Sequence, residues 1–166
     1  LINENIITVV GKYEDLKIFI KSDTQIIDAA GKTIMPGFND SHIHMWKVGN
    51  LKTFMLDVRG VNSKEEMLEL INIYHQQNPH LQWITARGFN EASWKEKEMP
   101  TKVDLDKISA VKPIYLIRTC AHIAVCNSLA LEMSEINACT KAPDGGTINM
   151  GADGQPNGII TETSLG

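Results

Sequence analysis

Cysteine is scarce in this sequence. Cys120, Cys126 and Cys139 are the only three among 166 residues, and no two of them have the C-x-x-C spacing. An odd number of cysteines without that spacing argues against a disulfide scaffold and against a zinc ribbon. We therefore expect a reducing compartment and predict a cytoplasmic protein.

Features of two other protein classes are also missing. The 16 Lys and Arg residues are outnumbered by 20 Asp and Glu residues, which leaves a formal net charge of −4. No basic patch stands out, so we expect no nucleic-acid partner. The apolar runs are far shorter than the roughly 20 residues that span a bilayer, and the first residues lack the pattern of a secretory signal. We therefore expect no membrane partner either.

The pattern of apolar residues changes near Gly60. Before Pro36, apolar and polar residues alternate in short segments, which predicts a β-meander with one face to bury (strands at 6–10, 16–20, 25–28 and 33–35). After Gly60 the period becomes that of a helix. Ser63 and Glu66 form a capping box at the start of this helix, and Asn78 is expected to end it.

Strands and helices then alternate towards the C-terminus. Apolar segments predict strands at 81–86 and 114–118, and helices are expected to begin near Thr101 and Asn127. Residues 143–158 contain five Gly and two Pro, so they should form a loop or a hairpin. The alternation of strands and helices places the chain in the α/β class.

His42 and His44 are the residues with the clearest chemistry. If they lie on a strand, both imidazoles point to the same face, about 7 Å apart, and can bind one metal ion. Asp40 lies on that face too and could support a metal ligand by a hydrogen bond. The non-functional alternative is an accidental H-x-H pair in a surface loop, and the pair alone does not distinguish a metal site from such an accident.

The segment from Asp28 to His44 resembles the one that leads into the metal-bearing barrel of the amidohydrolase superfamily. That family has Gly-Lys, then Pro-Gly, then D-x-H-x-H, as this chain has at 31–32, 36–37 and 40–44. Similarity to its YtcJ-like (N-substituted formamide deformylase-like) branch continues in five blocks: Arg87–Trp94, Pro100–Asp106, Pro113–Leu116, His122–Leu131 and Gly145–Glu162. One departure is that Cys120 and Ala121 stand where the family usually has an acidic residue and a Gly.

The resemblance implies a fold. A (β/α)8 barrel takes roughly 250 residues, so 166 residues cannot close one. We expect part of a β-sandwich in residues 1–36, the first barrel strand and a loop in 37–60, an α/β insert in 61–158, and the start of the next barrel strand in 159–166. Because the chain begins at Leu1, we expect it to be a piece of a longer protein.

The resemblance also implies a chemistry. A divalent metal, expected to be zinc with one or two ions in the whole protein, would activate a water that hydrolyses an amide- or formamide-type C–N bond. His42, His44 and Glu162 are the predicted metal ligands, and the catalytic Asp is expected outside this sequence. His122 and Trp94 are predicted to contact the small-molecule substrate. Each of three of these residues also has a purely structural interpretation. Glu162 could be a polar residue of a strand, His122 a hydrogen-bonded structural histidine, and Trp94 a core tryptophan.

Two other functions remain open from the sequence. A stand-alone module could bind a metal or ligand through His42, His44 and His122, and a fragment without a site could serve only for dimerisation. Unpaired strand edges lead us to expect a homo-oligomer. Because the later ligands are missing, we expect the chain to be inactive alone.

Overall fold

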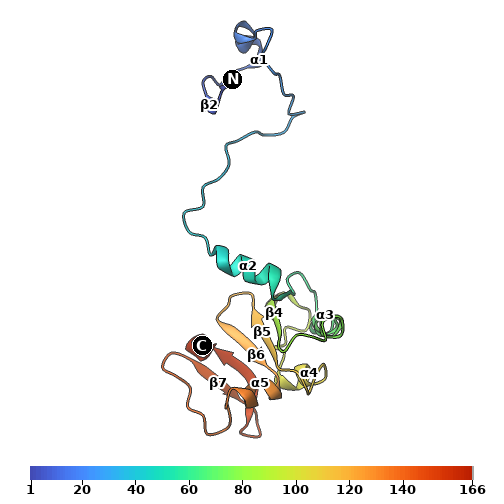
Figure 1. Cartoon of the computed structure of the whole chain (residues 1–166). Helices are drawn as coiled ribbons and strands as arrows, with labels where there is room; N and C mark the ends of the chain where they lie inside the picture. The colour runs from blue at the N-terminus through green and yellow to red at the C-terminus, as the bar shows by residue number, and fades with distance from the viewer. Residues whose placement is uncertain (166) are drawn as a thin grey trace. The chain divides into compact units, whose positions relative to one another are not determined.

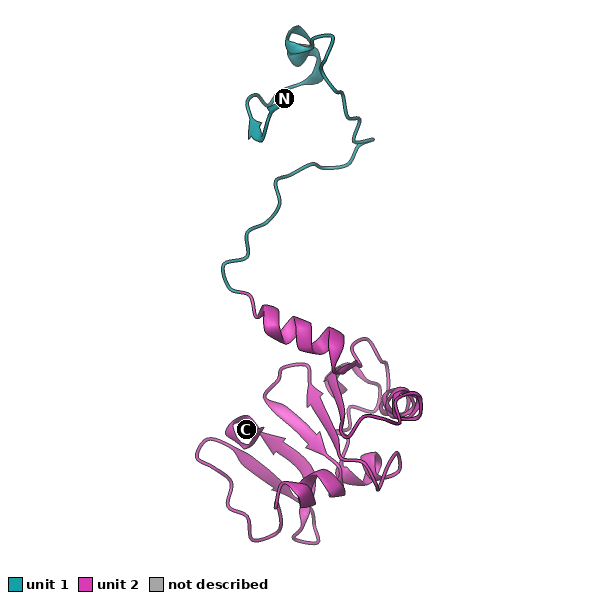
Figure 2. Ribbon diagram, viewed as in Figure 1, with its two compact units in different colours: residues 1–42 teal, residues 43–166 magenta. Residues whose placement is uncertain are grey.

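The computed structural model describes residues 1–165 and divides the chain into two compact units, Leu1–His42 and Ile43–Gly166 (Figure 2). In the first unit, β1 (Ile2–Asn3) pairs antiparallel with β2 (Ile6–Ile7). A short helix α1 (Tyr13–Leu16) and a 3-10 turn η1 (Lys17–Phe19) follow. None of residues 1–42 is buried, so this unit contributes nothing to the core of the chain.

The β-meander predicted before Pro36 differs from this structure. Residues 16–19 are helical, and residues 25–28 and 33–35 have no regular secondary structure. A strand with one apolar face is stable only when a neighbouring strand pairs with it and a second layer covers it. Within residues 1–42 only the two-residue strands β1 and β2 pair, and no residue is buried, so alternation alone is not enough to form the other predicted strands.

The strand predicted at His42 and His44 is also wrong in this structure. Residues 41–44 lie outside regular secondary structure, and helix α2 (Met45–Thr53) begins directly after His44, its N-terminal flanking residue. The reason is again pairing, because no strand within residues 1–165 pairs with this segment. The two imidazoles therefore do not share the face of a strand.

The second unit is built on one six-stranded sheet (Figure 1). Its strands in spatial order are β3 (Leu56–Asp57), β4 (Ile84–Phe89), β5 (Ile114–Arg118), β6 (Ile123–Cys126), β8 (Pro156–Thr161) and β7 (Thr147–Met150). The first three run parallel, and the pairs from β5 onwards are antiparallel. The predicted α/β class is confirmed, as is the hairpin within 143–158, formed by β7 and β8.

Helices begin where the sequence supplies caps. The Ser63 hydroxyl accepts the N–H of Glu66 (3.0 Å) and starts α3 (Lys64–Gln77), which ends at Asn78 as predicted. The Glu66 carboxylate bonds one residue further back than expected, to the N–H of Asn62 (2.7 Å). A capping box at Thr101 starts α4 (Lys102–Asp106), and Asn127 caps α5 (Ser128–Met133). Two further 3-10 turns are η2 (Glu91–Ser93) and η3 (Glu162–Leu165).

The sheet buries both faces. Alternate residues of β5 point to opposite sides, so Ile114 and Leu116 pack in one cluster while Tyr115 and Ile117 pack against another. The larger cluster lies against α3 and includes Met67 and Ile71. The smaller cluster includes residues of β6, α5 and β8. No helix within residues 1–165 is long and apolar enough to span a bilayer.

Candidate functional site

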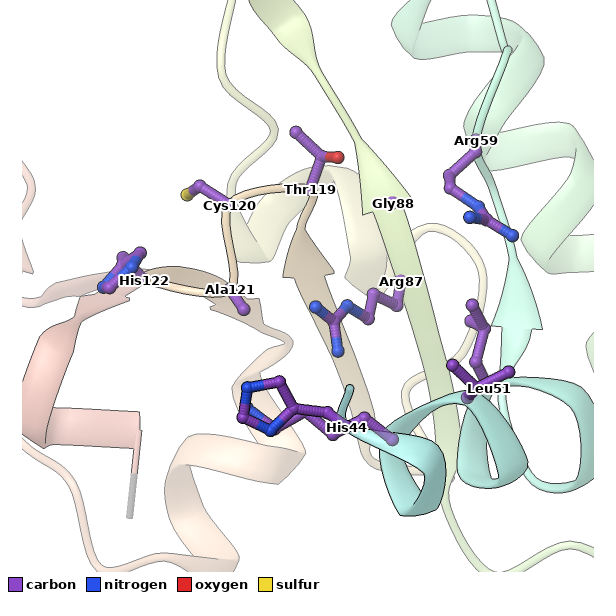
Figure 3. A pocket seen from close by; sticks show the side chains of 11 residues that line it. His44, Leu51, Arg59, Arg87, Gly88, Thr119, Cys120, Ala121 and His122 are labelled. Carbon is purple, nitrogen blue, oxygen red and sulfur yellow. The ribbon is translucent and has the colours of Figure 1, made fainter. Parts of the chain in front are cut away.

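A cavity of about 470 Å³ opens in the second unit at the ends of β4 and β5, beside α2 (Figure 3). Its lining consists mainly of cationic and small residues: His44, Lys47, Val48, Leu51, Arg59, Arg87, Gly88, Thr119, Cys120, Ala121 and His122. Within the described part of the chain, no Asp or Glu belongs to this lining. The cavity is therefore electropositive.

One side of the cavity is a single face of α2. His44, Lys47, Val48 and Leu51 are spaced three, one and three residues apart, which places them in one stripe along the helix. The stripe combines a cationic side chain with two aliphatic ones. Helix α2 therefore presents both charge and apolar surface to the cavity.

The opposite wall comes from β4 and from Arg59, which lies two residues after the neighbouring strand β3. Arg87 extends from β4 towards His44 and Ala121 (Figure 3). Gly88 has φ +118°, and a Cβ at this position would lie 2.3 Å from the Arg59 Cγ, so only glycine permits this approach. Arg59 is in turn held by the carboxylate of Asp57 (Nη2–Oδ2 2.6 Å).

A tight turn between β5 and β6 carries four of the lining residues, Thr119, Cys120, Ala121 and His122. The N–H of Ala121 donates to the Arg118 carbonyl (2.9 Å), and Ala121 has φ +62°. That left-handed conformation costs a residue with a Cβ about 1–2 kcal/mol. Glycine would carry no such cost, so Ala121 bears this strain in the turn.

An ion pair anchors the start of this turn. Arg118 Nε and Nη2 donate to the two carboxylate oxygens of Glu91 (2.8 and 2.9 Å), and both side chains are largely buried. The hydrogen bonds from Arg118 lower the pKa of Glu91, and the same contact raises that of the guanidinium. Such a bidentate, shielded pair fixes the turn against β4. The sequence analysis assigned no role to Arg118 or Glu91, because they are 27 residues apart.

Cys120 lies in this charged environment. Partial burial favours a raised pKa, but hydrogen bonds from the Arg118 side chain and the His122 backbone outweigh it and lower the pKa of the Cys120 thiol. Burial raises the pKa of Cys126 to about 11, in line with its interpretation as a small buried hydrophobe. A lowered pKa means more thiolate at neutral pH, and the thiolate is the reactive form.

We therefore expect Cys120 to react with iodoacetamide at pH 7 at least about tenfold faster than Cys126 in the folded protein. Peptide mass spectrometry at timed intervals measures both rates in one sample. In denaturant the two rates should converge, because burial and the Arg118 contact are both lost. Equal rates in the folded protein would contradict the environment described for Cys120.

His122 and Glu162 meet at the edge of the site. His122 Nδ1 lies 2.8 Å from Glu162 Oε2, and the N–H of Glu162 donates to the His122 carbonyl (2.9 Å). Glu162 follows β8 directly and has φ +49°. Both side chains are more than half exposed. The structure thus brings together a residue predicted to contact the substrate and one predicted to bind a metal, and their roles stay predictions.

The predicted metal ligands do not form a complete site in this structure. His42 is the last residue of the first unit, and His44 belongs to the second unit, which begins at Ile43. Asp40 Oδ1 accepts the N–H of His42 (3.0 Å). Within residues 1–165, no group of three His, Cys, Asp or Glu side chains is arranged to hold a metal ion. The described residues alone therefore supply no complete metal site.

Trp94 requires a correction. It was predicted to contact a substrate, but its side chain is 1% exposed and packs in the larger core cluster. Its indole N–H donates to the Val61 carbonyl (3.1 Å), and its ring lies against Phe89. Trp94 is therefore a core tryptophan, as the alternative interpretation had it. Arg87, for which no role was predicted, lines the cavity, and Trp94 does not. The sequence feature that could have indicated Arg87 is a basic residue at the end of an apolar segment.

Comparison with known proteins gives these residues a family context. The chain is 34% identical over 160 residues to the putative amidohydrolase YtcJ of Bacillus subtilis, and 29% identical over 169 residues to the N-substituted formamide deformylase of Arthrobacter pascens. These matches cover 96% and 99% of this chain. The chain spans 30% of the length of each of these two relatives.

A solved structure is similar as well. An uncharacterized metal-dependent hydrolase from Pyrococcus horikoshii OT3 matches 79% of this chain and 23% of its own, with a TM-score of 0.53 and 30% identity. Residues 25–165 match the amidohydrolase family, a range that includes the histidine pair and the whole cavity. This chain therefore belongs to the amidohydrolase family.

Proposed function

We propose that this chain contributes the first part of a metal-dependent hydrolase that cleaves an amide- or formamide-type C–N bond in a small molecule. The family match over residues 25–165 carries the proposal, because it spans both the H-x-H pair and the cavity. The relative named N-substituted formamide deformylase suggests the type of bond. The electropositive cavity beside His44 is the proposed substrate site.

The metal is proposed to be a divalent ion, with zinc as the first candidate and one or two ions in the whole protein. His42, His44 and Glu162 are its proposed ligands from this chain. The His122 contact uses Oε2 of Glu162 and leaves Oε1 for a metal. The remaining ligands and the catalytic Asp would lie outside residues 1–165. The chain alone is then proposed to be inactive.

We make further proposals about residues 1–36, the oligomeric state, the cellular location and the partners. We propose that residues 1–36 complete a β-sandwich only when partner strands are present, since no residue of this segment is buried. We further propose a cytoplasmic homo-oligomer without nucleic-acid or membrane partners. The exposed edge strands β3 and β7 are where copies could pair.

The test uses the complete product of the gene that encodes this chain, assayed on N-substituted formamides and simple amides. His42→Ala and His44→Ala should each lower kcat/KM by more than about 100-fold and reduce bound metal, because a missing ligand weakens the metal centre. His80→Ala is the matched control, since this exposed histidine lies outside the cavity. It should keep both activity and metal content.

Two results would contradict the proposal. Loss of activity in His42→Ala with unchanged metal content would exclude that residue as a ligand. The second contradicting result is that the 166-residue chain holds a full equivalent of zinc after dialysis and that His42→Ala loses it. It would favour a stand-alone metal-binding module. Elemental analysis of the two proteins distinguishes these outcomes.

A further inference from the structure

The three arginines of this chain are not equivalent. Arg59 is neutralised by Asp57, and Arg118 by Glu91, in both cases through two guanidinium nitrogens. Arg87 has no acidic partner among residues 1–165, although its side chain is partly buried. Withdrawing a guanidinium from water without a counter-charge is costly. A half-buried Arg87 that points into a cavity is therefore suited to an anionic ligand.

The surroundings of Arg87 also favour an anionic ligand. Lys47 and the imidazoles of His44 and His122 share the cavity with it, and no carboxylate of the described chain lines the cavity. Thr119 adds a hydroxyl to the lining. Lys47 and Arg87 are cationic side chains that line the same partly closed space, and such charges raise the local concentration of anions. The carboxylates of Asp57 and Glu162 are bonded to two lining residues, Arg59 and His122.

The cavity also has an apolar part. Val48 and Leu51 project from α2 on the same face as Lys47. A volume of about 470 Å³ lies within the roughly 300–1,000 Å³ range of small-molecule sites. A free inorganic anion would leave this apolar surface uncovered. An organic anion with a short hydrocarbon portion would cover it.

We propose that this cavity binds the carboxylate of a small organic acid, with Arg87 as the residue that recognises it. The guanidinium of Arg87 donates two parallel hydrogen bonds to the carboxylate, and the hydrocarbon portion lies on Val48 and Leu51. If the chain is part of a hydrolase, as proposed above, its substrate carries a carboxylate away from the bond that is cleaved. Binding itself requires neither metal nor hydrolysis.

The experiment is a titration of the ¹⁵N-labelled 166-residue chain with hexanoate, followed by amide chemical shifts. Hexanoate should bind with a Kd in the low millimolar range and shift resonances of residues 44–51, 87–88 and 119–122. Hexanamide has the same shape without the charge, and should bind at least about tenfold more weakly. Raising the salt concentration should weaken hexanoate binding, because the attraction is largely electrostatic.

Arg87→Gln should weaken hexanoate at least about tenfold, whereas Lys141→Gln, which removes the same charge from an exposed loop, should leave it unchanged. Thermal unfolding of both variants checks that the fold is kept. Equal binding of hexanamide, or full binding by Arg87→Gln, would overturn the proposal. Tighter binding of inorganic phosphate than of hexanoate would also overturn it. If hexanoate binds but the complete gene product hydrolyses no amide, the proposed function fails and this inference stands.

Discussion

Replacing Trp94 by Ala should lower the free energy of unfolding by about 3–5 kcal/mol, the range seen when a buried aromatic is truncated. Trp94 is 1% exposed, packs against Phe89 with 6.0 Å between ring centroids, and donates to the Val61 carbonyl. The substitution removes all three interactions and leaves a cavity. Urea denaturation followed by circular dichroism measures the loss.

The matched control is Trp83→Ala. Trp83 is 39% exposed and lies just before β4, so its truncation should cost less than about 1 kcal/mol. A small effect at Trp94 with a large one at Trp83 would contradict the burial pattern. If Trp94→Ala folds normally but loses hexanoate binding, the original substrate-contact interpretation of Trp94 would be restored.

Replacing Asn127 by Ala should be about as damaging, with an expected loss of roughly 3–5 kcal/mol. Asn127 is fully buried. Its Oδ1 accepts the N–H groups of Ile114 (2.9 Å) and Ala130 (3.0 Å). Its Nδ2 donates to the carbonyls of Ser109 and Lys112 (both 2.9 Å). The truncation therefore leaves four backbone groups without their partner and removes the cap of α5.

Asn137→Ala tests whether the effect comes from burial. Asn137 Oδ1 also accepts a backbone N–H, that of Cys139 (2.9 Å), but at an exposed site. Water can replace this bond, so the expected cost is below about 1 kcal/mol. Denaturation of the two variants side by side measures the difference. Similar losses in both would show that the Asn127 contacts contribute no more than an ordinary turn.

Local signals predicted part of the second unit. The Ser63 and Asn127 caps and the strand at 114–118 appear where the sequence placed them. Each of these caps and strands depends on residues within a few positions of one another, so the rest of the chain has little influence on whether it forms. The strand at 123–126 was missed, because four residues beside a turn carry too short a pattern.

The candidate site was predictable only in part. The H-x-H pair and the motif blocks indicated the family, and the family match confirms it. The strand geometry assumed for His42 and His44 failed, because a strand exists only with a partner and none within residues 1–165 pairs with that segment. Arg87 was within a recognised block, yet its role depends on which side chains face it across the cavity.

The sequence by itself determined the caps, the helical stripe of α3, the buried strand at 114–118 and the family, since all of these are encoded by neighbouring residues. Tertiary structure alone decided the strand order, the burial of Trp94 and the pairing of His122 with Glu162, 40 residues away. It also decided that Glu91 pairs with Arg118, 27 residues away, and that Arg87 has no acidic partner among residues 1–165. The physical reason is that side-chain contacts across a sheet depend on the register of strands far apart in the chain, which local periodicity does not specify.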